Sequence, residues 1–102
     1  MRILIADQRA DQRDLLKRIC VGHWVREAKY STQVLSKCKD FDLIFTEIWF
    51  PGLGGMEYIE MLKKKTTARV VIVSTADGHG LNDYIRKPFS RDQIKTYLNE
   101  HK

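Results

Sequence analysis

The sequence predicts an α/β protein built on a parallel sheet with helices on both faces. Short, β-branched apolar runs alternate along the chain with amphipathic helical patterns, as in strand–helix–strand units. The run 69–74 (RVVIVS) is apolar almost throughout, which is typical of a strand buried on both faces. The run 43–46 (LIFT) ends in an acid, Glu47, and Pro-Gly and Gly-Gly pairs then force a turn.

The chain opens with a strand and a helix. The apolar run 2–6 (RILIA) predicts a strand that ends at an acid, Asp7. A helix is expected from about Ala10 to Cys20, because three apolar residues recur there at helical spacing on one face. These residues are Leu15, Leu16 and Ile19.

The next strand and helix are short. Residues 24–28 have a strand pattern that includes two charged side chains, which suits an edge of the sheet. Ser31 and Thr32 are both suitable N-caps for a helix that reaches about Cys38. The central strand at 43–46 follows.

The second half continues the alternation. A helix is expected at 55–65, with an apolar stripe of Met56, Ile59 and Leu62, and the buried strand 69–74 comes next.

The chain then closes with a strand at 82–86 and a final helix. Ser90 begins a capping box with Gln93, so this helix is expected to run to about Asn99. Its inward-facing residues are expected to be Ile94, Tyr97 and Leu98.

The link between the last two strands departs from the pattern. Only about half a dozen residues, two of them glycines, separate Thr75 from Asn82, which is too short for the usual helical crossover. The fourth helix is therefore expected to be shortened or absent, so that one face of the sheet lacks its cover there. Two interpretations stay open: a bare loop over the sheet, or an apolar surface that serves as a dimer or partner interface.

The composition is that of one domain without a membrane segment. With 102 residues, 43% of them hydrophobic and 30% charged, residues 1–102 are expected to form a single domain around one core. No apolar run approaches the roughly 20 residues that span a bilayer, and the first residues lack a signal-peptide layout. We therefore expect a cytoplasmic protein. Cys20 and Cys38 lack the spacing of metal ligands and are expected to be reduced packing residues.

A net charge of +5 and a pI of about 9.4 fit either an acidic partner or nucleic acid. The basic residues are scattered, however, apart from the run 63–65, and they do not alternate with aromatic residues as in single-strand-binding proteins. Nucleic-acid binding is therefore the less favoured alternative. The three histidines, His23, His79 and His101, fall in loops or at the chain end and are expected on the surface.

Four side chains follow the predicted strands directly: Asp7, Glu47, Thr75 and Lys87. Because the carboxyl ends of parallel strands meet at one edge of a sheet, these side chains are expected to converge. Two carboxylates beside one lysine leave a charge that a metal or water must balance. From spacing alone, a plain ion-pair network and a binding site are equally good interpretations.

Four segments in this order, ILIADQ with Arg13 after it, DLIFTEIWFPGLGG, VVIVSTAD and NDYIRKPFS, resemble the receiver domain of bacterial response regulators. The resemblance covers nearly the whole chain. It implies a flavodoxin-like three-layer sandwich whose five-stranded parallel sheet has the order 2-1-3-4-5. It also implies a cytoplasmic role in two-component (phosphorelay) signal transduction, in which an aspartate after the third strand accepts a phosphoryl group with the help of Mg²⁺.

Carried over residue by residue, the resemblance is incomplete in the acidic pocket. Asp7 fits the first acid of that pocket, but Gln8 stands where the second acid, a Mg²⁺ ligand, is found in the family. Glu47 stands at the phosphoacceptor position in place of aspartate.

The other family positions are kept. Thr75 fits the switch hydroxyl, with Ser74 as an alternative one residue earlier, and Tyr84 fits the switch aromatic residue. Lys87 fits the phosphate-binding lysine, and the peptide bond before Pro88 is often cis in such domains.

The two departures weaken the phosphorylation chemistry. Mg²⁺ prefers charged oxygen ligands, so Asp7 and Glu47 alone are expected to bind no metal or only weak Mg²⁺. Glutamate carries its carboxylate about 1.5 Å further than aspartate, which misplaces it for in-line attack on a phosphodonor. The same reach lets Glu47 pair permanently with Lys87, with Asp7 and Thr75 in support.

The leading hypothesis is therefore an atypical receiver domain that binds another protein without a phosphorylation switch. The expected partner is a histidine kinase or a downstream signalling protein, and a homodimer through the uncovered sheet face is a further option. An enzyme with its own substrate is not expected, because no nucleophile is paired with a base. Two alternatives are kept: a working phosphoacceptor with weak Mg²⁺ binding, and a basic nucleic-acid-binding module.

Overall fold

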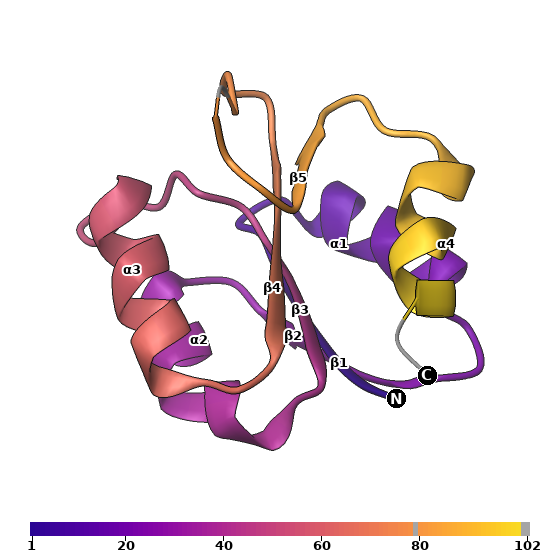
Figure 1. Ribbon diagram of the computed structural model, residues 1–102, viewed down its shortest axis with the longest axis horizontal. Coiled ribbons are helices and arrows are strands. Elements are labelled where there is room, and N and C mark those ends of the chain that lie inside the picture. The colour runs from indigo at the N-terminus through magenta and orange to yellow at the C-terminus, as the bar shows by residue number, and fades with distance from the viewer. Residues whose placement is uncertain (79, 101–102) are drawn as a thin grey trace.

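The computed structural model describes residues 1–78 and 80–100, and its five strands form one parallel sheet with the order β2-β1-β3-β4-β5 (Figure 1). The strands are β1 (Arg2–Ala6), β2 (Trp24–Ala28), β3 (Leu43–Thr46), β4 (Arg69–Ser74) and β5 (Tyr84–Arg86). The helices are α1 (Ala10–Ile19), α2 (Ser31–Lys37), α3 (Gly55–Lys65) and α4 (Arg91–Glu100), with a short 3₁₀ turn η1 (Cys38–Asp40). The fold class and the sheet order predicted from the sequence are confirmed. The predictions for His79 and His101 lie outside the described residues.

The sheet is the middle of three layers, with α1 and α4 on one face and α2 and α3 on the other (Figure 1). Successive strand residues point to opposite faces, so Ile5 and Phe45 join the core beneath α1 and α4, whereas Leu4 and Ile44 join the core beneath α2 and α3. The inner strands are thus buried on both sides, as their continuous apolar runs predicted.

The strand β2 lies at an edge of the sheet, as its charged residues predicted. Its Glu27 accepts hydrogen bonds from Arg13 Nε at 3.0 Å and Lys17 Nζ at 3.1 Å, both on α1. Partial burial tends to raise the pKa of Glu27, but these two cations outweigh it and hold the pKa below its usual value.

Two residues that were predicted to face inward are exposed. Leu15 and Met56 each keep 41% of their surface accessible, and α3 buries Tyr58 in place of Met56. A buried tyrosine is tolerated because its hydroxyl lies 2.8 Å from Thr46 Oγ1, so that the polar atom has a partner.

The element boundaries differ slightly from the sequence predictions. Tyr30, not Ser31 or Thr32, is the N-cap of α2, and the Gln33 side chain accepts the Tyr30 backbone N–H at 3.1 Å. The strand β5 begins at Tyr84 rather than Asn82, because Asp83 has a positive φ of 53°, which no extended strand contains.

The predicted capping box at the start of α4 is present. The Ser90 backbone N–H donates to Gln93 Oε1 at 2.7 Å, and the Gln93 N–H donates to Ser90 Oγ at 3.2 Å.

The link between β4 and β5 contains no helix in its described residues, 75–78 and 80–83, as predicted. The face beneath it is nevertheless not an open apolar surface. Ala76, Leu81 and Tyr84 fold back and pack against the core on the α2 and α3 side. None of the large exposed hydrophobic side chains of the described chain lies on β4, β5 or this link. The described residues therefore favour the bare-loop interpretation over an apolar dimer interface, and the homodimer itself stays a prediction.

Two further expectations can be compared with the structure. Within the described residues, no helix has both the length and the apolar character needed to cross a membrane. Cys20 and Cys38 are free and fully buried, and burial raises the pKa of the Cys20 thiol to about 11, as expected of packing residues.

Candidate functional site

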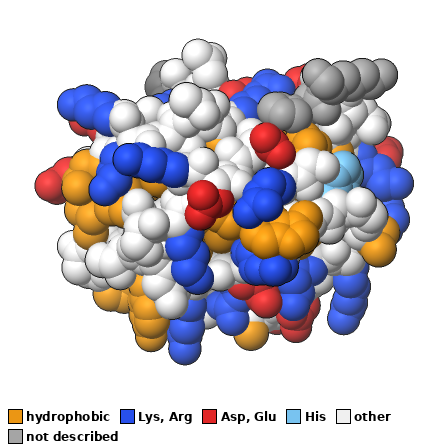
Figure 2. Space-filling model, turned by 90° about the horizontal axis from the view of Figure 1, so that it is seen from below, with side chains coloured by type: hydrophobic (Ala, Val, Ile, Leu, Met, Phe, Trp, Pro, Cys, Tyr) orange, Lys and Arg blue, Asp and Glu red, His pale blue; other side chains and the backbone are white. Residues whose placement is uncertain are grey.

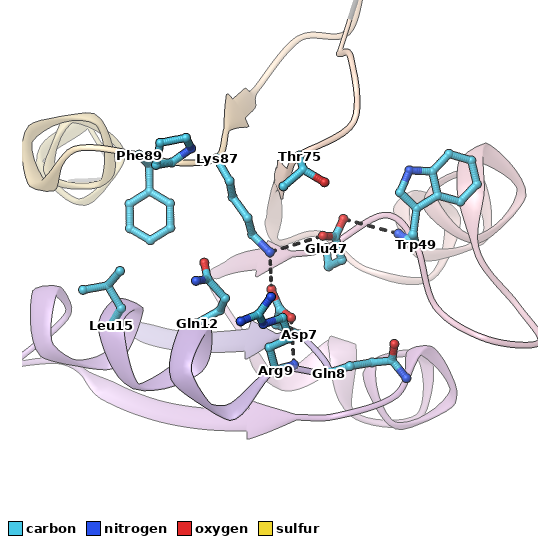
Figure 3. Close-up of a pocket in the computed structure, with 11 residues that line it drawn as sticks. Asp7, Gln8, Arg9, Gln12, Leu15, Glu47, Trp49, Thr75, Lys87 and Phe89 are labelled. Atoms are coloured by element: carbon cyan, nitrogen blue, oxygen red, sulfur yellow. Dashed lines mark hydrogen bonds and ion pairs between the residues drawn. The ribbon is translucent and has the colours of Figure 1, made fainter.

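The carboxyl ends of four strands meet at one edge of the sheet, and the side chains that follow them form a cluster (Figure 3). Asp7 follows β1, Glu47 follows β3, Thr75 follows β4 and Lys87 follows β5. The convergence predicted from the sequence is therefore present. The Lys87–Pro88 peptide bond is cis, as the resemblance led us to expect.

Lys87 is shared between two carboxylates. Its Nζ lies 2.6 Å from Asp7 Oδ2 and 3.2 Å from Glu47 Oε1. The side chains of Lys87, Asp7 and Glu47 are only 10%, 5% and 13% exposed, so the pairs are shielded from water. Shielding strengthens the attraction between these charges and makes the loss of any one partner costly.

The second oxygen of Glu47 is also engaged. Glu47 Oε2 accepts the backbone N–H of Ile48 at 2.6 Å and that of Trp49 at 3.3 Å. Both N–H groups belong to the turn that follows β3. Glu47 therefore bridges Lys87 and the backbone of its own turn, and each of its oxygens has a donor.

Asp7 is held from two sides as well. Its Oδ1 accepts the Arg9 backbone N–H at 2.9 Å, and its backbone carbonyl accepts Arg13 Nη1 at 2.6 Å. Arg13 also pairs with Glu27, so α1 and β2 together fix the position of the loop after β1. The result is a carboxylate whose direction is set before any ligand arrives.

Gln8 and Thr75, both predicted site residues, stand apart from this network. Gln8 lies in the same loop, but its side-chain amide points away from Lys87 (Figure 3). Thr75 is exposed, and its hydroxyl makes no hydrogen bond to any described residue. Thr75 lines the same cavity as Glu47 and Lys87, but no hydrogen bond joins it to either of them, so its role as the switch hydroxyl stays a prediction. Ser74, the alternative, is buried, and its hydroxyl accepts the Ala76 backbone N–H at 3.2 Å.

Tyr84 is half-buried beneath the link between β4 and β5. Its hydroxyl donates to the Ser74 carbonyl at 3.4 Å, and its ring packs so closely on Gly78 that a Cβ at that glycine would clash with it. Desolvation raises the pKa of the Tyr84 hydroxyl.

A cavity of about 350 Å³ opens above the cluster. Leu15 and Phe89 form one wall and Trp49 stands on the other side, with Lys87 between them (Figure 3). These wall residues were not predicted from the sequence to belong to the site. Trp49 carried the one available signal, an aromatic residue two positions after the strand-end acid.

The residues present do not fit the Mg²⁺ site that the family implies. The two carboxylates of the cavity already bind Lys87, and Gln8, at the position of the family's second acid, is uncharged and points away. Over residues 1–78 and 80–100, no group of three or more His, Cys, Asp or Glu side chains is placed to hold a metal ion.

Comparison with known proteins decides the family. The model of the response regulator receiver domain matches residues 3–99. This chain belongs to that family.

The relatives of this receiver domain include both longer regulators and single-domain proteins. It is 30% identical to the uncharacterized transcriptional regulatory protein YrkP of Bacillus subtilis over 91% of this chain and 46% of YrkP. It is 26% identical to the chemotaxis protein CheY homolog of Campylobacter jejuni over 98% of this chain and 91% of that protein. The chain spans less than half the length of the Bacillus subtilis regulators that it matches.

Solved structures show the same fold. A CheY-like response regulator receiver domain protein of Methanospirillum hungatei has a TM-score of 0.85 at 25% identity, covering 97% of this chain and 90% of that one. The receiver domain of NtrX from Brucella abortus has a TM-score of 0.82 at 29% identity, covering 97% of this chain and 96% of that one.

Proposed function

We propose that this receiver domain serves two-component signal transduction by binding another protein, without a phosphorylation switch. The observation that carries the proposal is the position of Lys87, whose amine is bonded to both Asp7 and Glu47. The built-in acid at position 47 holds the lysine that a transferred phosphoryl group would otherwise engage. We further propose that residues 1–102 form a single receiver domain and act in the cytoplasm.

The geometry of Glu47 supports this proposal. A phosphoacceptor needs a carboxylate oxygen that is free to attack, but Glu47 Oε1 faces Lys87 and Oε2 accepts two backbone N–H groups. To attack a phosphodonor, Glu47 must break its bond to Lys87 or its bonds to the backbone of its own turn. A carboxylate oxygen that is held away from the position of attack slows in-line phosphoryl transfer.

The charge of the cluster supports it as well. Asp7, Glu47 and Lys87 together carry a formal charge of −1 in a largely buried place. A phosphoryl group adds a further charge of about −1.5 to −2. Without a Mg²⁺ ion, Lys87 is the only cation within the buried cluster to offset it, and two carboxylates already share it.

The partner is proposed to be a histidine kinase or a downstream signalling protein. No catalytic role is proposed, because both carboxylates of the site are already bonded to its lysine. A receiver that phosphorylates on Glu47 with weakly bound Mg²⁺ is the alternative that the following experiment distinguishes.

The test is incubation of the protein with acetyl phosphate and Mg²⁺, followed by intact-mass measurement. The unmodified mass is expected for the natural chain. The double variant Gln8→Asp/Glu47→Asp, which restores the family's acids, serves as the matched control and is expected to gain a phosphoryl adduct. A stoichiometric adduct on the natural chain would end the proposal.

A further inference from the structure

The amino ends of the strands, opposite the Lys87 cluster, carry a second group of charged residues. All strands of a parallel sheet begin at one edge, so Arg2 at the start of β1 and Trp24 at the start of β2 lie there together, as neighbours in register. Arg26 lies two residues further along β2, on the same face as Trp24. Lys39 belongs to η1, which leads to the start of β3. We call these four residues the Trp24 surface.

Trp24 is the fixed centre of this surface. Its ring packs on the buried Phe41 at a centroid distance of 5.8 Å, and the side chain still exposes 38% of its area. The guanidinium carbons of Arg2 and Arg26 lie 3.8 and 3.9 Å from the ring centroid. The two guanidinium groups are therefore held by cation–π contacts within about 8 Å of each other.

Further contacts hold both arginines in place without neutralising them. Arg2 Nε donates to the Asp40 carbonyl at 2.7 Å, and Arg26 Nη1 donates to the Val25 carbonyl at 3.0 Å. A carbonyl takes one N–H and leaves the other guanidinium N–H groups for an incoming acceptor.

The cations of the Trp24 surface differ from those arginines of the chain that are neutralised by ion pairs. Arg69, at the start of β4, is bonded to both Asp83 and Glu100. Within residues 1–78 and 80–100, by contrast, Arg2, Arg26 and Lys39 belong to no ion pair. The exposed lysines 63–65 end α3 at this same end of the molecule, and Figure 2 shows many Lys and Arg side chains across it.

We propose that the Trp24 surface docks an acidic segment of a partner protein. An exposed tryptophan flanked by arginines has the composition of the energetic centre of a protein interface, and two guanidinium groups this close can each bind a carboxylate. The surrounding lysines would speed association with an acidic partner.

The contacts of Trp24 favour binding of a protein segment over binding of nucleic acid. The Trp24 ring is already covered by guanidinium groups, so it offers no free face for a base to stack on. Strand addition to β2 is disfavoured because Arg26 caps the Val25 carbonyl.

The test is an NMR titration of the full chain with oligoglutamate, followed at the two indole N–H signals. Trp24 lies at the amino ends of the strands and Trp49 beyond their carboxyl ends, so Trp49 is an internal control. The Trp24 signal is expected to shift while that of Trp49 stays, and oligoglutamine is expected to shift neither. Arg26→Gln is expected to weaken binding about fivefold, and Arg91→Gln, the same charge change on the start of α4, is expected to leave it unchanged.

Equal shifts of both indole signals, or no binding of oligoglutamate at low salt, would overturn the proposal. A duplex DNA that binds the Trp24 surface more tightly than oligoglutamate at the same salt concentration would also overturn it, in favour of nucleic acid. The titration does not involve phosphoryl transfer, so its outcome and that of the acetyl phosphate experiment are independent.

Discussion

Lys87 Nζ lies closer to Asp7 than to Glu47, 2.6 Å from Oδ2 of the aspartate against 3.2 Å from Oε1 of the glutamate. The sequence suggested the opposite emphasis, with Glu47 as the main partner of the lysine. In the folded chain, Asp7 anchors the lysine, and Glu47 links the pair to the turn after β3.

The two carboxylates should therefore contribute unequally to stability. Asp7→Asn is expected to lower the free energy of unfolding by about 2 kcal/mol and Glu47→Gln by about 1 kcal/mol, because the aspartate makes the shorter and more buried contact. Urea denaturation at neutral pH measures both. Glu60→Gln, an exposed change on α3, is the control and should have almost no effect. A larger loss for Glu47→Gln would contradict this order.

Removing the lysine should cost more than removing either acid. Lys87→Met leaves two carboxylates close together and largely buried without a cation, for which a loss of roughly 3 kcal/mol is expected. The matched change Lys95→Met, at a half-buried lysine of α4, should cost less than about 0.5 kcal/mol. If urea denaturation gives equal values for the two variants, the cluster does not stabilise the fold.

The ion pairs of Glu27 with Arg13 and Lys17 predict that the stability of the fold depends on pH. The pKa of Glu27 is lower in the folded chain than its ordinary value, so the folded state binds fewer protons at this group than the unfolded state. Its contribution to stability is fully present above the ordinary glutamate pKa and is lost as the pH falls through the lowered value. Glu27→Gln should flatten this part of the pH dependence, measured by urea denaturation from neutral to acidic pH. An unchanged profile would show that Arg13 and Lys17 do not favour the ionised form.

The close packing of Tyr84 on Gly78 predicts a steric effect in the link between β4 and β5. Gly78→Ala should lower the free energy of unfolding by about 1–3 kcal/mol, because the new methyl group meets the tyrosine ring. In a Tyr84→Ala background the same change should cost little, since the ring is gone. Equal costs in both backgrounds, by thermal or urea denaturation, would contradict this packing.

The fold was largely predictable because its strands have the continuous apolar character that burial on both faces requires. The boundaries of α3 and β4 agree with the prediction, since Gly55 and Arg69 punctuate them clearly. Periodicity did not distinguish Met56 from Tyr58 as the buried residue of α3. That choice depends on the hydroxyl of Thr46 on a neighbouring strand, which no local pattern reveals.

The residues that make up the site were predictable from the sequence, but the hydrogen bonds among them were less so. Strand ends brought Asp7, Glu47 and Lys87 together, as a parallel sheet must. Thr75 lines the cavity without a hydrogen bond to Glu47 or Lys87, and no local sequence pattern encodes the orientation of that hydroxyl. The described residues of the link, 75–78 and 80–83, contain no helix, in agreement with the prediction, but the way Leu81 packs back on the core was not foreseen.

The most direct test of the central claim is an amide NMR titration with Mg²⁺ and beryllofluoride, an inorganic mimic of the phosphoryl group. Because Glu47 already holds Lys87, we predict that the resonances of Asp7, Glu47 and Thr75 stay in place over the whole titration. Saturable shifts of these three resonances would contradict the account, since they would show that the site still accepts a metal and a phosphoryl group.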